Sequence, residues 1–151
     1  MAVVTLHEVE SNNTDLLYLI SKLDQYLYER YPSDEVYVID FSDPDISKTI
    51  FVVAYDNEMP IGCGAIRPLD EVTVELKRFF VEPDYRKQGI AGMILNYLHE
   101  KAYSLAFSTI RLETGAQQPE AISFYKKHGY VEIEKFGEYV DCGSSLCFEK
   151  Q

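Results

Sequence analysis

The segment from Val81 to Gly92 constrains the fold most, because it joins a strand-like run directly to an amphipathic helix. Residues 72–81 are rich in β-branched and aromatic side chains with partial alternation, which predicts a strand. From Ile90 onward, apolar residues recur at helical spacing, at Ile94, Leu95, Leu98, Ala102 and Leu105. The first N–H groups of a helix have no internal partner and lie at the positive end of its dipole. The segment therefore predicts a strand, a tight turn, and a helix start that can bind an anion.

The composition of this turn also indicates an anionic ligand. Gly89 removes the side chain that would block a close approach to the backbone. Four of the 14 Lys and Arg residues lie between Lys77 and Lys87, in a chain whose formal net charge is −11. Taken alone, the segment leaves open a plain tight turn with solvated Arg86 and Lys87.

A second block predicts another strand followed by a short helix. Residues 111–115 have the pattern of a strand and its exit. Pro119 suits the first helical position, Glu120 complements the positive helix start, and Gly129 suits the left-handed position beyond the helix end. The two blocks thus repeat one arrangement, in which a strand leads through a turn into a helix.

Together the two blocks resemble those of the GNAT superfamily of N-acetyltransferases. The pyrophosphate motif of that family is Arg or Gln, two residues, Gly, one residue, and Gly or Ala, and here Arg86, Gly89 and Ala91 fill these places. The second family pattern is Asn, two residues, Ala, three residues, Tyr, three residues, Gly and an aromatic residue. Gln118 stands where Asn is commoner, and the other places are filled by Ala121, Tyr125, Gly129 and Tyr130.

The resemblance implies one GNAT acyl-CoA N-acyltransferase domain over residues 1–151, with a central, mostly antiparallel sheet. It also implies acetyl-CoA as the acetyl donor. In the family, the strand before the turn separates from its neighbour, so a backbone N–H near Phe79 would contact the thioester carbonyl. Core packing of the Phe side chains is compatible with that role. The implied cofactor-binding residues are Phe79, Phe80, Val81, Arg86, Lys87, Gln88, Gly89, Ile90, Ala91, Gly92 and Gln118.

The order of predicted elements supports a mixed α/β sheet with helices on both faces. Strands are expected at 3–10, 48–55, 60–68, 72–81, 109–113, 130–135 and 145–149. Helices are expected at about 14–30, from 90 and from 119, the first capped by Asn13 or Thr14. Residues 56–58 suit a hairpin turn. A Rossmann domain is disfavoured because no Gly-x-Gly-x-x-Gly follows an early strand, and the missing Gly-Lys-Ser/Thr excludes a P-loop kinase.

Acetyl transfer requires groups that deprotonate the amine and stabilise the departing thiolate. Tyr125 is the candidate general acid, because a neutral phenol of pKa near ~10 can protonate or hydrogen-bond the sulfur. Glu75 is the candidate general base, because regular alternation would place Glu75, Lys77 and Phe79 on one face of the strand. The span is roughly 13 Å, which requires an extended acceptor or a water relay. An ordinary helix tyrosine and a solvent-facing carboxylate are the alternatives.

The acidic composition limits the classes of binding partner that are expected. A net charge of −11 disfavours nucleic acid and anionic membranes and is compatible with cationic amines. The resemblance places the segment after the first helix on the acceptor side, and a solvated loop is the favoured alternative. Its acidic residues are Asp34, Glu35, Asp40, Asp43 and Asp45.

The lack of long apolar runs and of patterned cysteines bears on cellular location and on metal binding. No apolar run approaches about 18 residues and the start lacks a leader pattern, so a cytoplasmic protein is expected. The three cysteines, at 63, 142 and 147, suit neither a disulfide framework nor a metal site.

We therefore expect an N-acetyltransferase that moves the acetyl group of acetyl-CoA to a primary amine of an unidentified small molecule or peptide. Direct attack in a ternary complex is expected, because neither motif contains a cysteine nucleophile. The alternative is a non-catalytic acyl-CoA-binding regulatory module, which would need neither Tyr125 nor Glu75. The resemblance also allows a homodimer, paired through the sheet edge or the last strands.

Overall fold

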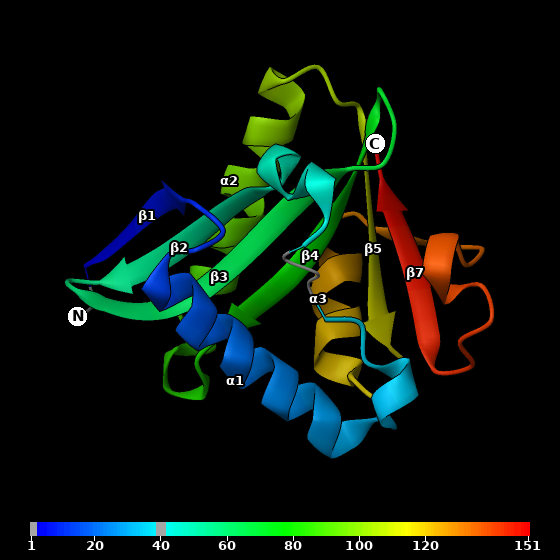
Figure 1. The fold of residues 1–151 in the computed structure, drawn as a ribbon, viewed down its shortest axis with the longest axis horizontal. Coiled ribbons are helices and arrows are strands. Elements are labelled where there is room, and N and C mark those ends of the chain that lie inside the picture. The colour runs from blue at the N-terminus through cyan, green and yellow to red at the C-terminus, as the bar shows by residue number, and fades with distance from the viewer. Residues whose placement is uncertain (1–2, 39–41) are drawn as a thin grey trace.

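Seven strands form a single sheet in the order β1-β2-β3-β4-β5-β7-β6, in a computed structural model that describes residues 3–38 and 42–151 (Figure 1). Neighbouring strands are antiparallel except for β4 and β5, which are parallel. The predicted mixed, mostly antiparallel sheet is confirmed. The strands are β1 (Val4–Val9), β2 (Ile50–Asp56), β3 (Met59–Pro68), β4 (Thr73–Val81), β5 (Thr109–Gly115), β6 (Val131–Ile133) and β7 (Ser145–Lys150).

Helices cover both faces of the sheet, as predicted (Figure 1). Helix α1 (Thr14–Arg30) packs on one face, whereas α2 (Ile90–Ser104) and α3 (Pro119–Lys127) pack on the other. Short 3-10 helices lie in the connections, namely η1 (Ser33–Glu35), η2 (Pro44–Lys48), η3 (Pro83–Tyr85) and η4 (Gly137–Tyr139). Among the residues described, no helix is both long and apolar enough to span a bilayer.

The ends of the elements follow the local signals in the sequence. The Asn13 side chain accepts a hydrogen bond of 3.0 Å from the Leu16 N–H and caps α1. Pro119 is the first residue of α3, and Gly129 takes a φ of +90° just beyond its end. Asn57 takes a φ of +55° in the short turn between β2 and β3. Each of these signals was therefore sufficient to locate an element boundary.

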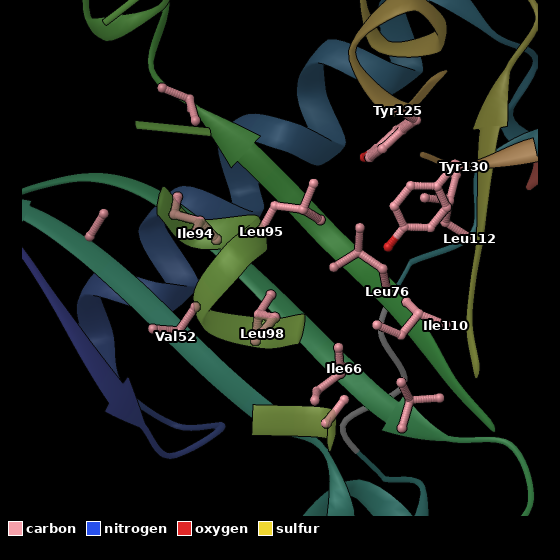
Figure 2. Packing of buried hydrophobic residues seen from close by; sticks show 14 of the residues in the cluster. Val52, Ile66, Leu76, Ile94, Leu95, Leu98, Ile110, Leu112, Tyr125 and Tyr130 are labelled. Carbon is pink, nitrogen blue, oxygen red and sulfur yellow. The ribbon is translucent and has the colours of Figure 1, made fainter. Parts of the chain in front are cut away.

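Two glycines let α2 lie close to the sheet. A Cβ atom on Gly62 or on Gly64 would lie 3.0 Å from the Ile94 side chain. Ile94, Leu95 and Leu98 are fully buried in the cluster that α2 forms with the sheet (Figure 2). This packing holds α2 close against β3, the strand that pairs with β4.

A β-bulge interrupts β4. Phe80 pairs with Cys63, but Ala65 pairs with Lys77, so β4 contains one more residue than β3 over this step. Arg78 has a φ of +52°, which is unusual for a residue with a side chain. The predicted common face for Glu75 and Phe79 is wrong, because the bulge reverses the alternation after Lys77. Phe79 packs beside α2 and α3, whereas the Glu75 side chain lies on the α1 face.

Strands β4 and β5 separate from the bulge onward. Their pairing runs from Thr73 with Thr109 to Leu76 with Leu112, and no later residues of the two strands pair. Figure 1 shows the two strands diverging toward the end of β4. The separation leaves backbone groups of both strands without a neighbouring strand at the middle of the sheet.

Candidate functional site

The turn between η3 and α2 exposes a row of unpaired backbone donors. None of the N–H groups of residues 87–92 has a hydrogen-bond acceptor among the described residues, and the first helical bond runs from the Met93 N–H to the Gly89 carbonyl. Lys87 and Gly89 have φ angles of +64° and +82°. Successive N–H groups in such a turn can converge on an anion.

Gly89 leaves open space in front of these donors. A Cβ atom at Gly89 would have no atom within 4 Å, and residues 86–89 are exposed. The Arg86 Nε donates to the Val81 carbonyl at 2.9 Å, and its guanidinium lies 5.8 Å from the Phe80 ring centroid. Arg86 therefore fastens the turn to the end of β4, while Gln88 reaches back to the Asp84 carbonyl at 3.3 Å.

Tyr125 projects from α3 toward the separated strands. Its ring lies 6.2 Å from the Phe79 ring on β4. It lies 5.7 Å from the Tyr130 ring, as Figure 2 shows for this pair. The side chain is 7% exposed, and burial together with the nearby Glu113 charge raises its pKa well above the ordinary phenol value. Among the described residues, no hydrogen bond involves its hydroxyl. The phenol thus stays protonated at neutral pH on the same face as α2.

The three residues at the end of β4 point to different sides of the sheet. Phe79 and Val81 contribute to the core under α2 and α3, and Phe80 to the core under α1. Their side chains pack in the core, which is compatible with the expected backbone role near Phe79. Only their backbone groups remain for a ligand that lies between β4 and β5.

The side-chain oxygen of Gln118 is engaged in hydrogen bonds within the chain. It accepts a 3.1 Å hydrogen bond from the Gly115 N–H and one of 3.3 Å from the Tyr31 hydroxyl. A Cβ atom at Gly115 would lie 1.7 Å from the Tyr31 hydroxyl oxygen, so only glycine fits there. Gln118 therefore ties the exit of β5 to the end of α1 and keeps only its amide N–H groups for a ligand.

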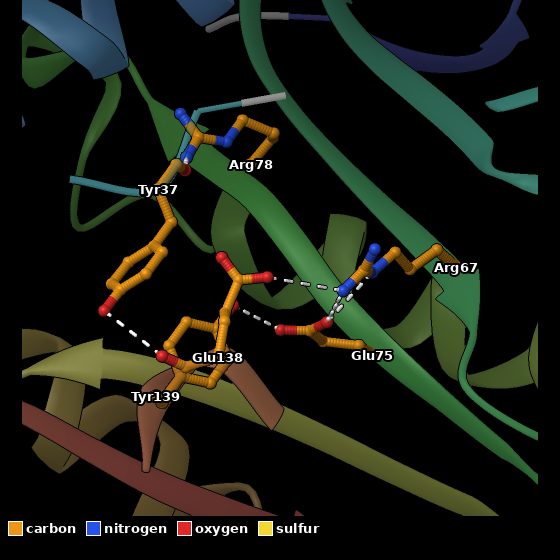
Figure 3. A network of polar contacts seen from close by, with 6 residues as sticks. All are labelled: Tyr37, Arg67, Glu75, Arg78, Glu138 and Tyr139. Atoms are coloured by element: carbon orange, nitrogen blue, oxygen red, sulfur yellow. Dashed lines mark hydrogen bonds and ion pairs between the residues drawn. The ribbon is translucent and has the colours of Figure 1, made fainter. Parts of the chain in front are cut away.

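Glu75 is the centre of a buried polar network on the α1 face (Figure 3). One carboxylate oxygen accepts from the Arg67 Nε at 3.0 Å, and the other accepts from the Tyr139 hydroxyl at 2.6 Å. Glu138 lies 3.8 Å from the Arg67 guanidinium, and Tyr37 packs edge-on against Tyr139. The carboxylate is 1% exposed, with both of its oxygens engaged. This arrangement suits an anchor between β3, β4 and η4 better than a proton acceptor.

Two charged residues that sequence reasoning did not select lie where the strands separate. Lys77 on β4 and Glu113 on β5 follow the last paired residues, Leu76 and Leu112. Because both leucines belong to the core under α2 and α3, Lys77 and Glu113 point to the α1 face. Burial lowers the pKa of Lys77 and raises the pKa of Glu113. Only the register of β4 with β5 shows that Lys77 and Glu113 are neighbours, and local sequence patterns do not contain that register.

The acidic segment after α1 is partly engaged by the protein. The Glu35 carboxylate accepts from the Ser144 hydroxyl at 2.5 Å and lies 3.6 Å from the Cys142 Sγ. Asp40 lies outside the described residues. The expected position of this segment on the acceptor side stays a prediction.

The chain matches known acetyltransferases over most of its length. The family model for the acetyltransferase (GNAT) domain matches residues 47–132. The IAA acetyltransferase of Azospirillum brasilense is 33% identical, and the match covers 99% of each chain. A Klebsiella pneumoniae structure assigned as an acyl-CoA N-acyltransferase is 28% identical, with a TM-score of 0.87 over 99% of this chain and 98% of the other.

One further solved structure relates the fold to coenzyme A. The PaiA N-acetyltransferase of Thermoplasma acidophilum, in complex with coenzyme A, has a TM-score of 0.77 over 99% of each chain, at 19% identity. At that identity the likeness shows the fold alone. Together with the family match and the fold, the relatives establish that this chain is an acetyltransferase enzyme of the GNAT superfamily.

Proposed function

We propose that the protein transfers the acetyl group of acetyl-CoA to an amine by direct attack in a ternary complex. The observation that carries the proposal is the row of unpaired N–H groups at residues 87–92, next to the separation of β4 and β5. The exposed turn would hold the pyrophosphate through these N–H groups. A pantetheine arm leading from the turn would then pair with the free edges of the separated strands and bring the thioester near Tyr125.

The backbone of the bulge would polarise the thioester carbonyl. Positive charge density at an N–H near Phe79 stabilises the oxygen on which negative charge develops during attack. Such a donor needs a fixed position, and the ion pair between Arg78 and Asp24 holds the bulge against α1. The bond from the Cys63 Sγ to the Arg78 carbonyl, at 3.2 Å, restrains the other side of the same peptide segment.

Tyr125 would act on the departing sulfur mainly as a hydrogen-bond donor. A thiol titrates near ~8.5, whereas burial lifts the pKa of Tyr125 above the ordinary phenol value of ~10. Complete proton transfer from the phenol to the thiolate is therefore uphill. A hydrogen bond from the phenol still stabilises the negative charge on sulfur as the C–S bond breaks.

The test is release of free thiol from acetyl-CoA in the presence of a panel of primary amines. We expect amine-dependent release by the wild type and a loss of about 10²-fold or more in kcat for Tyr125→Phe, with the affinity for CoA retained. Tyr103→Phe, at an exposed position on α2, is the control. CoA binding without release of thiol from acetyl-CoA, whichever amine is added, would instead support the non-catalytic acyl-CoA-binding module.

A further inference from the structure

Lys77 and Glu113 are opposite charges that face each other across the strand separation without forming an ion pair. The parallel register pairs Glu75 with Arg111 and Leu76 with Leu112, so Lys77 and Glu113 are the next residues of the two strands. In a continuous ladder, such neighbours on one face would be in contact. Here no Lys77 nitrogen lies within 4.0 Å of a Glu113 oxygen, although both residues are described and half-buried.

The hydrogen bonds of the described residues leave both groups available. One Glu113 oxygen accepts from the Ser145 hydroxyl at 2.6 Å, and its second oxygen accepts none of the hydrogen bonds found. The Lys77 ammonium donates none of these bonds, and the adjacent Arg78 is already engaged by Asp24 and by the Tyr37 carbonyl. Glu75 is likewise saturated by Arg67 and Tyr139.

Partial burial makes both charges costly in the free protein. Burial lowers the pKa of Lys77 and raises that of Glu113, so each group lacks full compensation for its charge. A ligand with an ammonium group and a carboxylate, placed between the strands, would neutralise both at once. A simple amine would compensate only Glu113 and would leave Lys77 unpaired.

We propose that the acceptor is an amino carboxylic acid, whose amine is bound and deprotonated by Glu113 and whose carboxylate is bound by Lys77. The inference rests on the proposed acetyl transfer and names its acceptor class. The bound ammonium gives one proton to Glu113, and its nitrogen then forms a C–N bond with the thioester carbon. The C–S bond breaks, its electron pair leaves with sulfur, and the second amine proton passes to that sulfur. Glu113 returns its proton to water.

Matched pairs of acceptors test the proposal directly. Acetylation of L-phenylalanine, L-histidine and L-lysine is compared with that of phenethylamine, histamine and cadaverine, which lack only the carboxylate. We expect the wild type to prefer the amino acid of at least one pair. Lys77→Gln should raise the KM for that amino acid about 10- to 100-fold and leave the KM for the corresponding amine unchanged. Lys77→Arg should restore the preference, and Lys127→Gln, an exposed lysine on α3, is the charge-matched control.

Glu113→Gln should lower kcat/KM about 10²- to 10⁴-fold for amino acid and amine alike, because both need the base. Glu132→Gln, at an exposed position on β6, is its control. Turnover of amines that is indifferent to the carboxylate, in wild type and Lys77→Gln alike, would overturn the inference and leave the proposed function standing. If no amine is acetylated, calorimetric titration of the twenty common amino acids into CoA-saturated protein decides. Binding weakened by Lys77→Gln supports the acceptor class, and absence of binding overturns it.

Discussion

At the scale of single residues, the position of a carboxylate decides between structure and catalysis. Glu75 was predicted as the base from a regular strand pattern, but the structure places it under Tyr139 and against Arg67. A carboxylate with both oxygens bonded, at 1% exposure, would have to break one of these bonds to accept a proton from a substrate. Glu113 needs no such rearrangement, because one of its oxygens is free of the hydrogen bonds found among the described residues.

Glu75→Gln separates the two roles. We expect the free energy of unfolding to fall by about 1–3 kcal/mol, because the amide keeps the size of the side chain but not the charge opposite Arg67. Glu138→Gln is the control, since Glu138 lies 3.8 Å from the same guanidinium with a side chain that is 44% exposed. Its unfolding free energy should be close to that of the wild type. Urea unfolding measures both. A Glu75→Gln variant of unchanged stability that loses the acidic limb of the pH–rate profile would return the base role to Glu75.

At the scale of elements, local sequence patterns locate most strands and helices. They do not determine the register between strands that are distant in the sequence. Capping by Asn13, the proline at 119 and the glycine at 129 are signals carried by a few neighbouring residues, and they marked element ends correctly. The pairing of β4 with β5 depends instead on the whole sheet, so Glu113 could not be placed opposite Lys77 from sequence.

The bulge in β4 shows a second limit of local reasoning. Regular alternation fails over residues 75–79, because Lys77 and Arg78 both point to the α1 face. A run of two cations followed by two phenylalanines breaks alternation, and that break was the available signal. Arg78 accepts a left-handed backbone because its guanidinium pairs with Asp24 on α1, a contact between residues 54 apart in the chain. Strain of this kind is maintained only by tertiary contacts.

Helix α2 is joined to the segment after α3 by a buried His99, which should make folding stability depend on pH. Its Nε2 lies 2.6 Å from the Tyr130 hydroxyl, and burial lowers the pKa of His99 to about 4, from about 6.5 in an unfolded chain. Between these values the unfolded chain binds the extra proton. The contribution of His99 to stability is therefore complete above pH 6.5 and is lost as the pH falls toward 4.

His99→Gln should remove this dependence while keeping a polar partner for Tyr130. Relative to the variant, the wild type should lose up to about 3 kcal/mol more in unfolding free energy between pH 7 and pH 4. Urea titrations at several pH values measure the difference, and His7→Gln on the exposed edge strand β1 is the control. Parallel pH curves for wild type and His99→Gln would show that His99 is protonated without cost in the folded state.

At the scale of the whole molecule, the sheet divides the site into two sides. The turn at 87–92 and Tyr125 lie with α2 and α3, whereas Lys77 and Glu113 face α1. Among the described strands, the two sides meet only where β4 and β5 are unpaired, since elsewhere the ladder closes the sheet. A donor and an acceptor could thus approach from opposite faces and meet at a thioester between the strands. Such an approach would allow the proposed direct transfer without a covalent enzyme intermediate.

Binding of CoA at the turn should stabilise the entire fold, because the turn is formed only in the folded chain. At 100 times the dissociation constant, the gain is about 2.7 kcal/mol and is measurable as a higher melting temperature. Gly89→Leu should abolish most of this gain, because its side chain would enter the open space before the N–H groups and its backbone would be strained at φ +82°. Gly137→Leu is the matched control, with φ +55° and equally open surroundings. Without CoA, both variants should be less stable than the wild type. When CoA is added, the melting temperature of Gly137→Leu should rise as much as that of the wild type, whereas that of Gly89→Leu should rise little. If Gly89→Leu is stabilised by CoA as strongly as wild type, the pyrophosphate does not bind at this turn.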